Sequence, residues 1–543
     1  MKVRKYGTKI EISFAYQPHL VSFVKSLEGR SYSQASRTWF IPLANASVNI
    51  QRLTERGFQV EESLLQEVGK DIQEAQEAEQ LAQQPDAEFN SPLPLFPFQK
   101  VGAAFLHKVG SGILADDMGL GKTIQALAVC EYLKAEKVLI FCPASVKWQW
   151  AQEIKKFAGK DAVVVEGTPK ERNLLWTHKD FHTYFIANYE LLLRDFNYLS
   201  ARDWDVIIGD EATRISNPRA RQSKLIKKLK AKRRLALTGT PISNRAQEIW
   251  NLVDFCQPGA IGKYWDFINR YCLKNKFGGI EGYQNLDELQ SRLKRYMIRR
   301  MKIDVLPELP AKITTDIPFE LSDEEKALYK RLKKEILFEI EKQDISKMEN
   351  PISIQYTLVK MTRLRQLADS MELLGTNSKS SKLEVLKDLL SEALVEGKKA
   401  IIFTQFAKMA DILERELAEY KPLKISGAIK ERYKDVVDKF NTDQNNFILI
   451  MTSAGQYGLN IQRASIIFHY DQEWSLAKML QRTGRAYRYG QKEKVLEYNL
   501  LAIGTIDYYI KKVLHGKTEL SNKVLGDVPL TMDNIKEMLN YEE

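Results

Sequence analysis

Two segments of the chain carry glycine, hydroxyl and charged residues at spacings that suit phosphate chemistry. The first is the run Asp116-Asp117-Met118-Gly119-Leu120-Gly121-Lys122-Thr123, which follows an apolar segment and opens a helical pattern. Small glycines let backbone N–H groups curl around phosphate oxygens, while Lys122 would reach the outer phosphates and Thr123 would ligate Mg²⁺. The positive end of the following helix would face the anion. The run predicts a site for ATP and Mg²⁺, with Asp116 in place of the usual first glycine.

The second segment is an acidic pair that follows a strand-like run. Val206-Ile207-Ile208-Gly209 is typical of a buried strand, and Asp210 and Glu211 come at its carboxyl end, where open α/β sheets place their ligands. Asp210 would hold Mg²⁺ and Glu211 would polarise the attacking water. Taken alone, an acidic pair after a strand is more often a helix N-cap with its neighbour. The phosphate loop upstream favours the catalytic interpretation.

Two arginines near the end of the chain could stabilise charge on a transferring phosphoryl group. Arg485 and Arg488 stand three residues apart and would share one face if the segment were helical. Supplied from a second lobe, planar guanidinium groups would make hydrolysis depend on lobe closure. The alternative is a pair of solvated surface arginines.

Strand-like runs that end in polar residues recur along the chain and form two groups, at about residues 89–300 and 379–515. The runs are 138–141, 206–208, 235–237, 401–403 and 447–451. Buried parallel strands that feed a loop-borne site have this pattern. Between the groups, 321–347 and 352–368 have helical spacing. We therefore expect an α/β fold with two parallel-sheet lobes, a helical insertion and, at the start, a small α/β module.

Composition limits the remaining possibilities. A chain of 543 residues predicts three or four domains, and none of its apolar runs approaches the roughly 18 residues that span a bilayer. The net charge of +11 favours a polyanionic partner. The cysteines, at positions 130, 142, 256 and 272, form no C-x-x-C pair, which argues against zinc or a disulfide framework. The first residues carry no secretion signal, so secretion is not expected. Since no histone-reading region is apparent, the chain is expected in the cytoplasm of a bacterium or a phage-infected host, associated with the nucleoid.

The ordered motifs resemble those of the Swi/Snf-type ATPases, double-stranded DNA translocases of helicase superfamily two, over about residues 92–526. Asp116 in the loop is itself usual in that family. The other matching segments are Leu95-Phe96-Pro97-Phe98-Gln99, Asp210 to Asn217, Leu237 to Asn244, Ile298 to Lys302, Asp304 to Pro310, Ser453-Ala454-Gly455, Gly458-Leu459-Asn460 and Gln481 to Gln491.

The resemblance implies a role for each matching residue. Gln99 would contact adenine, and Arg485 and Arg488 would act as arginine fingers. The nucleotide loop would comprise Met118, Gly119, Leu120, Gly121, Lys122 and Thr123, with Asp210 and Glu211 as metal and water residues. Contacts to the DNA backbone or coupling of the lobes would fall to Ser145, Asn188, Thr240, Thr404, Gln405, Ser453 and Asn460. Such contacts grip a strand without reading sequence. The alternative for each is an ordinary turn hydrogen bond.

Two positions depart from the family pattern. Thr213 stands where the family usually has His, and Gln456-Tyr457 replaces a small pair that typically starts with Gly. Both lie where hydrolysis is linked to motion, so we expect them to affect coupling and to leave the catalytic residues untouched.

The opening segment resembles the HARP domain of annealing helicases, on Phe14, Tyr16, Gly29-Arg30, Tyr32, Arg37, Trp39 and Pro42. Aromatic and arginine side chains suit base stacking and phosphate contact. Equally, Trp39, Phe40 and Ile41 fit a hydrophobic core. The predicted organisation is a HARP-like DNA-structure-binding module (1–64), a helical linker (65–88), RecA-like lobe 1 (89–310), a helical insertion (311–378), RecA-like lobe 2 (379–515) and a C-terminal brace (516–543).

Together these features predict an ATP-dependent translocase on double-stranded or forked DNA, acting in strand annealing, fork remodelling or recombination repair, without a membrane partner. An RNA-polymerase-recycling or phage-defence translocase is a second possibility. A DNA-binding clamp that has lost hydrolysis is a third, and the intact Lys122, Asp210, Glu211, Arg485 and Arg488 argue against it.

Overall fold

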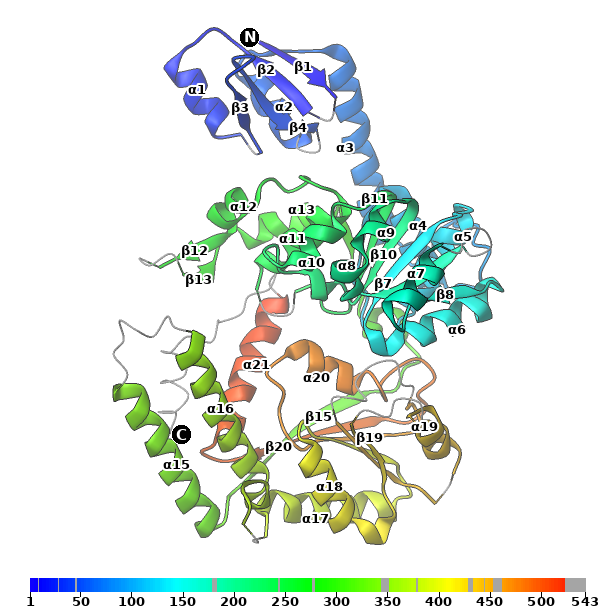
Figure 1. Ribbon diagram of the computed structural model, residues 1–543, viewed down its shortest axis with the longest axis vertical. Helices are drawn as coiled ribbons and strands as arrows, with labels where there is room; N and C mark the ends of the chain where they lie inside the picture. Colours follow the sequence, from blue (N-terminus) through cyan, green and yellow to red (C-terminus); the bar gives the residue numbers. More distant parts are fainter. Residues whose placement is uncertain are drawn as a thin grey trace. The chain divides into compact units, whose positions relative to one another are not determined.

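The computed structural model places the chain in two compact units, Met1–Val305 and Leu306–Leu520 (Figure 1). It describes all residues except 8, 28, 44–45, 178–182, 243–244, 276–278, 343–350, 377–378, 428–432, 444, 453–460 and 523–543. Among the described helices, none has the length and hydropathy needed to cross a membrane.

The first unit begins with a small module built on a five-stranded sheet of order β3-β4-β2-β1-β5 (blue in Figure 1). Its elements are β1 (Lys2–Tyr6), β2 (Lys9–Ser13), α1 (Pro18–Lys25), β3 (Ser31–Ser33), β4 (Thr38–Pro42), α2 (Ala46–Glu55) and β5 (Gln59–Val60). Alternation along β1, β2 and β4 directs Val3, Ile12 and Ile41 to one core with α1 and α2. The helices therefore cover one face of this sheet.

A long helix, α3 (Glu62–Ala82), leads from the module to the first lobe. Leu64 and Val68 at its start belong to the module core. Further along, Glu77 forms an ion pair with Lys108, and Glu79 pairs with Lys294 at 3.1 Å. The predicted linker is thus helical for most of its length and is tied to both parts of the first unit.

The first lobe is a seven-stranded parallel sheet of order β14-β6-β11-β10-β7-β9-β8. Its strands are β6 (Gly112–Leu114), β7 (Val138–Cys142), β8 (Ala162–Val164), β9 (Tyr184–Asn188), β10 (Asp203–Asp210), β11 (Lys230–Leu237) and β14 (Met297–Ile298). Its helices are α4 (Pro97–Val109), α5 (Lys122–Tyr132), α6 (Lys147–Ala158), α7 (Pro169–Thr177), α8 (Leu191–Arg194), α9 (Phe196–Ser200), α10 (Arg221–Ile226), α11 (Gln247–Cys256), α12 (Tyr264–Tyr271), α13 (Leu286–Leu293) and α14 (Lys302–Val305). A hairpin of β12 (Cys272–Lys274) and β13 (Ile280–Tyr283) stands apart from this sheet.

The second unit contains a six-stranded parallel sheet of order β15-β20-β19-β16-β18-β17. Its strands are β15 (Lys312–Phe319), β16 (Ala400–Phe403), β17 (Leu423–Ile425), β18 (Ile448–Met451), β19 (Ile466–His469) and β20 (Val495–Ala502). Its helices are α15 (Asp323–Lys342), α16 (Pro351–Asp369), α17 (Ser381–Val395), α18 (Ala407–Glu416), α19 (Tyr433–Thr442), α20 (Leu476–Thr483) and α21 (Ile506–Asn522).

The predicted fold class is confirmed: two α/β lobes of parallel strands accompany a small N-terminal α/β sheet. One difference concerns residues 311–378, which we expected to be a helical insertion. This segment opens with β15, an edge strand of the second sheet, before α15 and α16. Most of β15 is exposed and it contains Pro318 near its end, so it lacks the continuous apolar pattern of the buried strands.

Candidate nucleotide-binding site

The predicted phosphate loop lies between the carboxyl end of β6 and the start of α5. Gly119 and Gly121 hold φ angles of +84° and +73°, which favour glycine, and a Cβ at Gly121 would collide with the amide of Gln99. The Lys122 ammonium donates to the carbonyl oxygens of Asp116 and Asp117, at 2.8 and 3.3 Å. α5 has no side-chain cap, so the N–H groups of its first turn face the loop. The loop fits a phosphate by its donors and its shape.

Gly239 closes one side of this loop, since β11 lies between β6 and β10 in the sheet. A Cβ at Gly239 would lie 2.7 Å from Cγ of Met118 and 3.6 Å from Nζ of Lys122. The segment after β11 therefore approaches the loop to van der Waals distance. The sequence analysis placed Gly239 within the matching segment Leu237 to Asn244 and named Thr240, but it assigned the glycine no role.

Asp210 ends β10 and is held by several groups. The Trp150 indole N–H donates to Oδ2 at 2.8 Å, and the Glu211 N–H donates to Oδ1 at 3.0 Å. Burial raises the pKa of Asp210, and the Trp150 hydrogen bond, the Lys122 charge and the Glu211 N–H oppose that rise. The positive charge of Lys122 thus acts directly on the carboxylate of Asp210. The sequence did not predict this hydrogen bond, because Trp150 belongs to none of the recognised motifs.

Glu211 has a left-handed backbone, with φ 48° and ψ 53°, and precedes the short 3₁₀ helix Ala212–Ile215. Its side chain makes no capping hydrogen bond to that helix. The capping alternative is therefore not supported for Glu211. A non-glycine residue in this conformation costs about 1–3 kcal/mol and is concentrated at functional sites.

Asp116, the departure from the usual loop pattern, has a buried cationic partner. Arg300 donates from Nε to Oδ1 of Asp116 at 2.9 Å and from a second nitrogen to Oδ2, while Gln125 donates to Oδ2 at 3.1 Å. The third nitrogen of the Arg300 guanidinium donates to the carbonyl oxygen of Phe98. The Asp117 N–H also donates to the Arg300 carbonyl at 2.9 Å. This network joins α4, the loop, α5 and the end of β14.

Gln99, the predicted adenine contact, is buried at the start of α4. Its Oε1 accepts from the Phe96 N–H at 3.0 Å, and its Nε2 donates to the Leu120 carbonyl at 3.1 Å. The side chain thus connects the start of α4 with the phosphate loop. Its contact with adenine stays a prediction.

The predicted DNA-contact residues of the first lobe lie along the same carboxyl edge as the loop. Ser145 is exposed after β7, and Thr240 is buried after β11. Asn188 ends β9 and donates from Nδ2 to Glu190 at 2.6 Å. Of the three, Ser145 presents the most accessible side chain.

In the second unit, a buried cluster joins the ends of β16 and β19. The Thr404 hydroxyl and the Gln405 N–H both donate to Oδ2 of Asp471, at 2.7 and 2.6 Å. Arg482 donates to Asp471 and to Glu473, at 3.3 and 3.1 Å. Because Thr404 is fully buried and bonded to Asp471, its hydroxyl joins the end of β16 to the segment after β19.

Arg485 and Arg488 do not share a helix face. α20 ends at Thr483, and the two arginines follow in a series of turns, each half-buried. The spacing argument required a helix, but the helical bond from the Gly484 N–H to Leu480 at 2.8 Å is followed by tighter bonds from Arg485 to Arg482 and from Ala486 to Thr483. Ser453, Asn460 and Gln456-Tyr457 lie outside the described residues.

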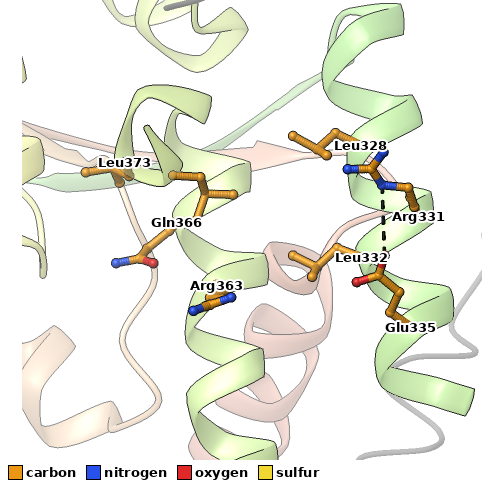
Figure 2. Close-up of a pocket in the computed structure, with 8 residues that line it drawn as sticks. Leu328, Arg331, Leu332, Glu335, Arg363, Gln366 and Leu373 are labelled. Carbon is orange, nitrogen blue, oxygen red and sulfur yellow. Dashed lines mark ion pairs between the residues drawn. The ribbon is translucent and has the colours of Figure 1, made fainter. Parts of the chain in front are cut away.

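A cavity of about 380 Å³ lies between α15 and α16, lined by leucines and by Arg331, Arg363, Glu335 and Gln366 (Figure 2). Arg331 and Glu335 form an i,i+4 ion pair at 3.9 Å along its rim. None of the predicted site residues lines it.

The residues present fit both predicted ligands. The loop supplies N–H donors and an ammonium for phosphates, and Thr123 and Asp210 supply oxygens of the kind that Mg²⁺ takes. Among the described residues no cluster of three or more His, Cys, Asp and Glu occurs. The pair of Thr123 and Asp210 suits Mg²⁺, which is usually held by one or two carboxylates and by substrate phosphates.

The SNF2-related domain matches residues 16–373 of the chain. The chain belongs to the SNF2-related family. The helicase conserved C-terminal domain follows it at residues 381–490. The resemblance to Swi/Snf-type enzymes is therefore confirmed, and so is the prediction of a helicase-family ATPase at the level of the family. The HARP-like interpretation of residues 1–64 stays a prediction.

Relatives of this SNF2-related chain include bacterial proteins. It is 32% identical over 457 residues to the putative ATP-dependent helicase/translocase YwqA of Bacillus subtilis, covering 79% of this chain and 49% of that protein. It is 34% identical over 426 residues to an uncharacterized ATP-dependent helicase of Mycoplasma pneumoniae, covering 76% and 40%. The chain thus spans less than half the length of these relatives.

Among solved structures, the SWI2/SNF2 ATPase core of Sulfolobus solfataricus in complex with double-stranded DNA is 30% identical. The match covers 85% of this chain and 100% of that one, with a TM-score of 0.40.

Proposed function

We propose that this chain hydrolyses ATP in order to move along double-stranded DNA. The observation that carries the proposal is the convergence of Lys122, Gly239 and Asp210 at the carboxyl edge of the first sheet. At this edge, a loop that fits phosphate lies near the Asp210 carboxylate, on which the positive charge of Lys122 acts. Membership of the SNF2-related family supports the same conclusion.

Each residue has a distinct proposed role. Lys122 binds the outer phosphates, and Thr123 and Asp210 hold Mg²⁺, which neutralises phosphate charge when bound. Glu211 polarises the attacking water. Arg485 and Arg488 stabilise the charge that develops on the transferring group.

DNA is proposed to bind through its phosphates and sugars rather than its bases. The proposed contacts are Ser145, Asn188, Gln405, Ser453 and Asn460, while Thr240 and Thr404, which are buried, are proposed to take part in coupling the lobes. The net charge of +11 is consistent with a polyanionic partner.

Phosphate release with and without duplex DNA tests the proposal. We expect a low basal rate and strong stimulation by duplex, because the two arginines belong to the second unit and the nucleotide loop to the first. Glu211→Gln should keep ATP binding and lose turnover, whereas Lys122→Ala should weaken ATP binding itself. An equal rate with and without DNA would contradict DNA-dependent hydrolysis, and equal loss of ATP affinity in both variants would contradict the division of roles.

We further propose that the N-terminal module gives preference for forked or single-stranded DNA in annealing or fork remodelling. Its open sheet face, opposite the helices, carries Tyr6 and Phe40 with ring centroids 5.6 Å apart. Lys9 lies over the Phe40 ring at 5.9 Å, and Arg4 is exposed beside its partner Glu11. Aromatic rings interleaved with cations suit stacked bases and phosphates. Trp39, which we expected to contribute, packs instead toward the module core.

Replacing both Tyr6 and Phe40 by alanine tests this role. Preference for forked over plain duplex DNA should fall, while duplex-stimulated ATPase activity stays near that of the parent. Leu65→Ala is the control, because Leu65 is 43% exposed on α3 and lies outside the sheet. Deleting residues 1–64 should have the same effect and should also reduce the salt dependence of binding. A double variant that still favours forks to the same degree would refute the role of this face.

A further inference from the structure

A buried carboxylate in the second unit collects donors from three separate elements. Glu497 on β20 accepts from Lys312 Nζ at 2.5 Å and from the Thr314 hydroxyl at 2.7 Å, both on its Oε2. Its Oε1 accepts from His469 Nε2 at 2.9 Å and from the Thr483 hydroxyl. Glu497 therefore connects β15, β19 and the last residue of α20.

The charges of this cluster are balanced. Burial lowers the pKa of His469, although its bond to Glu497 opposes that shift, so the imidazole is neutral at neutral pH. Among the described residues, Nδ1 of His469 has no hydrogen-bond partner, which fits a neutral ring that donates from Nε2. Lys312 is then the cation that balances the ionised Glu497. The hydrogen bonds to both of its oxygens therefore hold the Glu497 carboxylate in one position.

Thr483 sets the geometry of the segment that carries the arginines. Its carbonyl oxygen accepts the N–H groups of Ala486 and Tyr487, at 3.2 and 2.9 Å, so a tight turn forms around Arg485. The preceding residue, Arg482, is fully buried and bonded to Asp471. Both residues before Gly484 are thus held by carboxylates, Arg482 by Asp471 after β19 and Thr483 by Glu497 within β20.

We infer that Glu497 is a positioning residue for Arg485 and Arg488, acting through the Thr483 hydroxyl. This inference rests on the proposed ATPase function. No motif pointed to Glu497, which lies outside the arginine motif and contacts no proposed substrate group. The carboxylate holds the end of α20 in place, and the turn beyond it presents the arginines.

Thr483→Val and Thr483→Ser form the decisive pair, because valine keeps the shape and removes the donor while serine keeps the donor. Thr483→Val should lower the duplex-stimulated kcat roughly tenfold, since small displacements of catalytic groups cost that much or more. The KM for ATP and the Kd for duplex DNA should change less than twofold, roughly. Thr483→Ser should restore most of kcat, and Glu497→Gln should reproduce the loss.

Asp507→Asn is the matched control. Asp507, on α21, is buried like Glu497 and forms an ion pair with Lys382 at 2.7 Å. It should lower stability without changing kcat. In an Arg485→Ala background, Thr483→Val should have little further effect on kcat, since the two act through one group. If the parent hydrolyses ATP and Thr483→Val is equally active, the positioning role alone would be overturned. The same holds if the losses of kcat from Thr483→Val and Arg485→Ala are fully additive. A parent without ATPase activity would overturn the proposed function, and this role with it.

Discussion

At the residue scale, the phosphate loop is enclosed by groups that lie far from it in sequence. Gln99 precedes it, while Gly239 and Arg300 follow it by more than a hundred positions. The sequence predicted the loop residues because glycine, lysine and threonine occur at fixed spacing within one segment. It did not predict the partner of Asp116, because pairing across a parallel sheet depends on strand order and no local pattern contains that order.

Gly239 should be intolerant of any side chain. Gly239→Ala would place a methyl group 2.7 Å from Cγ of Met118, which must move together with the loop. Overpacking of this kind costs about 1–3 kcal/mol, so ATP affinity should fall roughly tenfold. Nucleotide titration by fluorescence or calorimetry measures the change.

Gly69→Ala is a suitable control, because a Cβ at Gly69 meets nothing within 4 Å on helix α3. It should leave ATP affinity unchanged and stabilise the helix by up to about 1 kcal/mol. Combining Gly239→Ala with Met118→Ala should recover part of the lost affinity. Unchanged ATP affinity in Gly239→Ala would mean that the loop does not need this close approach.

At the element scale, the Asp116–Arg300 ion pair fastens β14 and α4 to the nucleotide loop. Both side chains are buried, with 0% and 9% of their surface exposed. Removing one partner of a buried pair leaves an uncompensated charge and costs about 3–5 kcal/mol. Arg300→Ala and Asp116→Gly should both lower the free energy of unfolding by about that amount, measured by urea unfolding with tryptophan fluorescence.

The control for this pair is Lys155→Ala, which breaks the exposed ion pair of Lys155 with Asp161 at 3.0 Å. An exposed pair of this kind contributes less than about 1 kcal/mol. If Arg300→Ala were no more destabilising than Lys155→Ala, the ion pair would not be what holds these elements together.

Only some of the buried strands were predicted, because β9, β19 and β20 also lie inside their sheets and were not singled out as apolar runs. The five apolar runs predicted as strands correspond to β7, β10, β11, β16 and β18, and each lies inside a parallel sheet. β15 escaped prediction, because an exposed edge strand needs no apolar run. The end of α20 escaped too, since the spacing of Arg485 and Arg488 is equally compatible with turns.

At the scale of the whole molecule, the proposed chemistry is divided between two units. Lys122, Asp210 and Glu211 belong to the first, and Arg485 and Arg488 belong to the second. Within the first unit, the N-terminal module is attached to the lobe by the ion pair of Arg30 with Asp266 at 3.3 Å and by Lys263, which donates to the Arg30 carbonyl at 2.6 Å. We therefore propose that movement along DNA requires both units. The N-terminal module would move together with the first lobe, to which it is bonded.

Thr213 tests whether hydrolysis and motion can be separated. It lies two residues after Glu211 in the short helix Ala212–Ile215 and is half-buried, where Swi/Snf-type enzymes usually have His. An imidazole is larger than a threonine side chain and can donate and accept, so Thr213→His should change the contacts of this helix without touching the nucleotide residues. Triplex displacement per ATP hydrolysed should change roughly twofold or more, with a smaller change in the rate of phosphate release. Thr213→Ser, which keeps the hydroxyl, should match the parent, and an unchanged ratio of displacement to hydrolysis in Thr213→His would show that this position does not govern coupling.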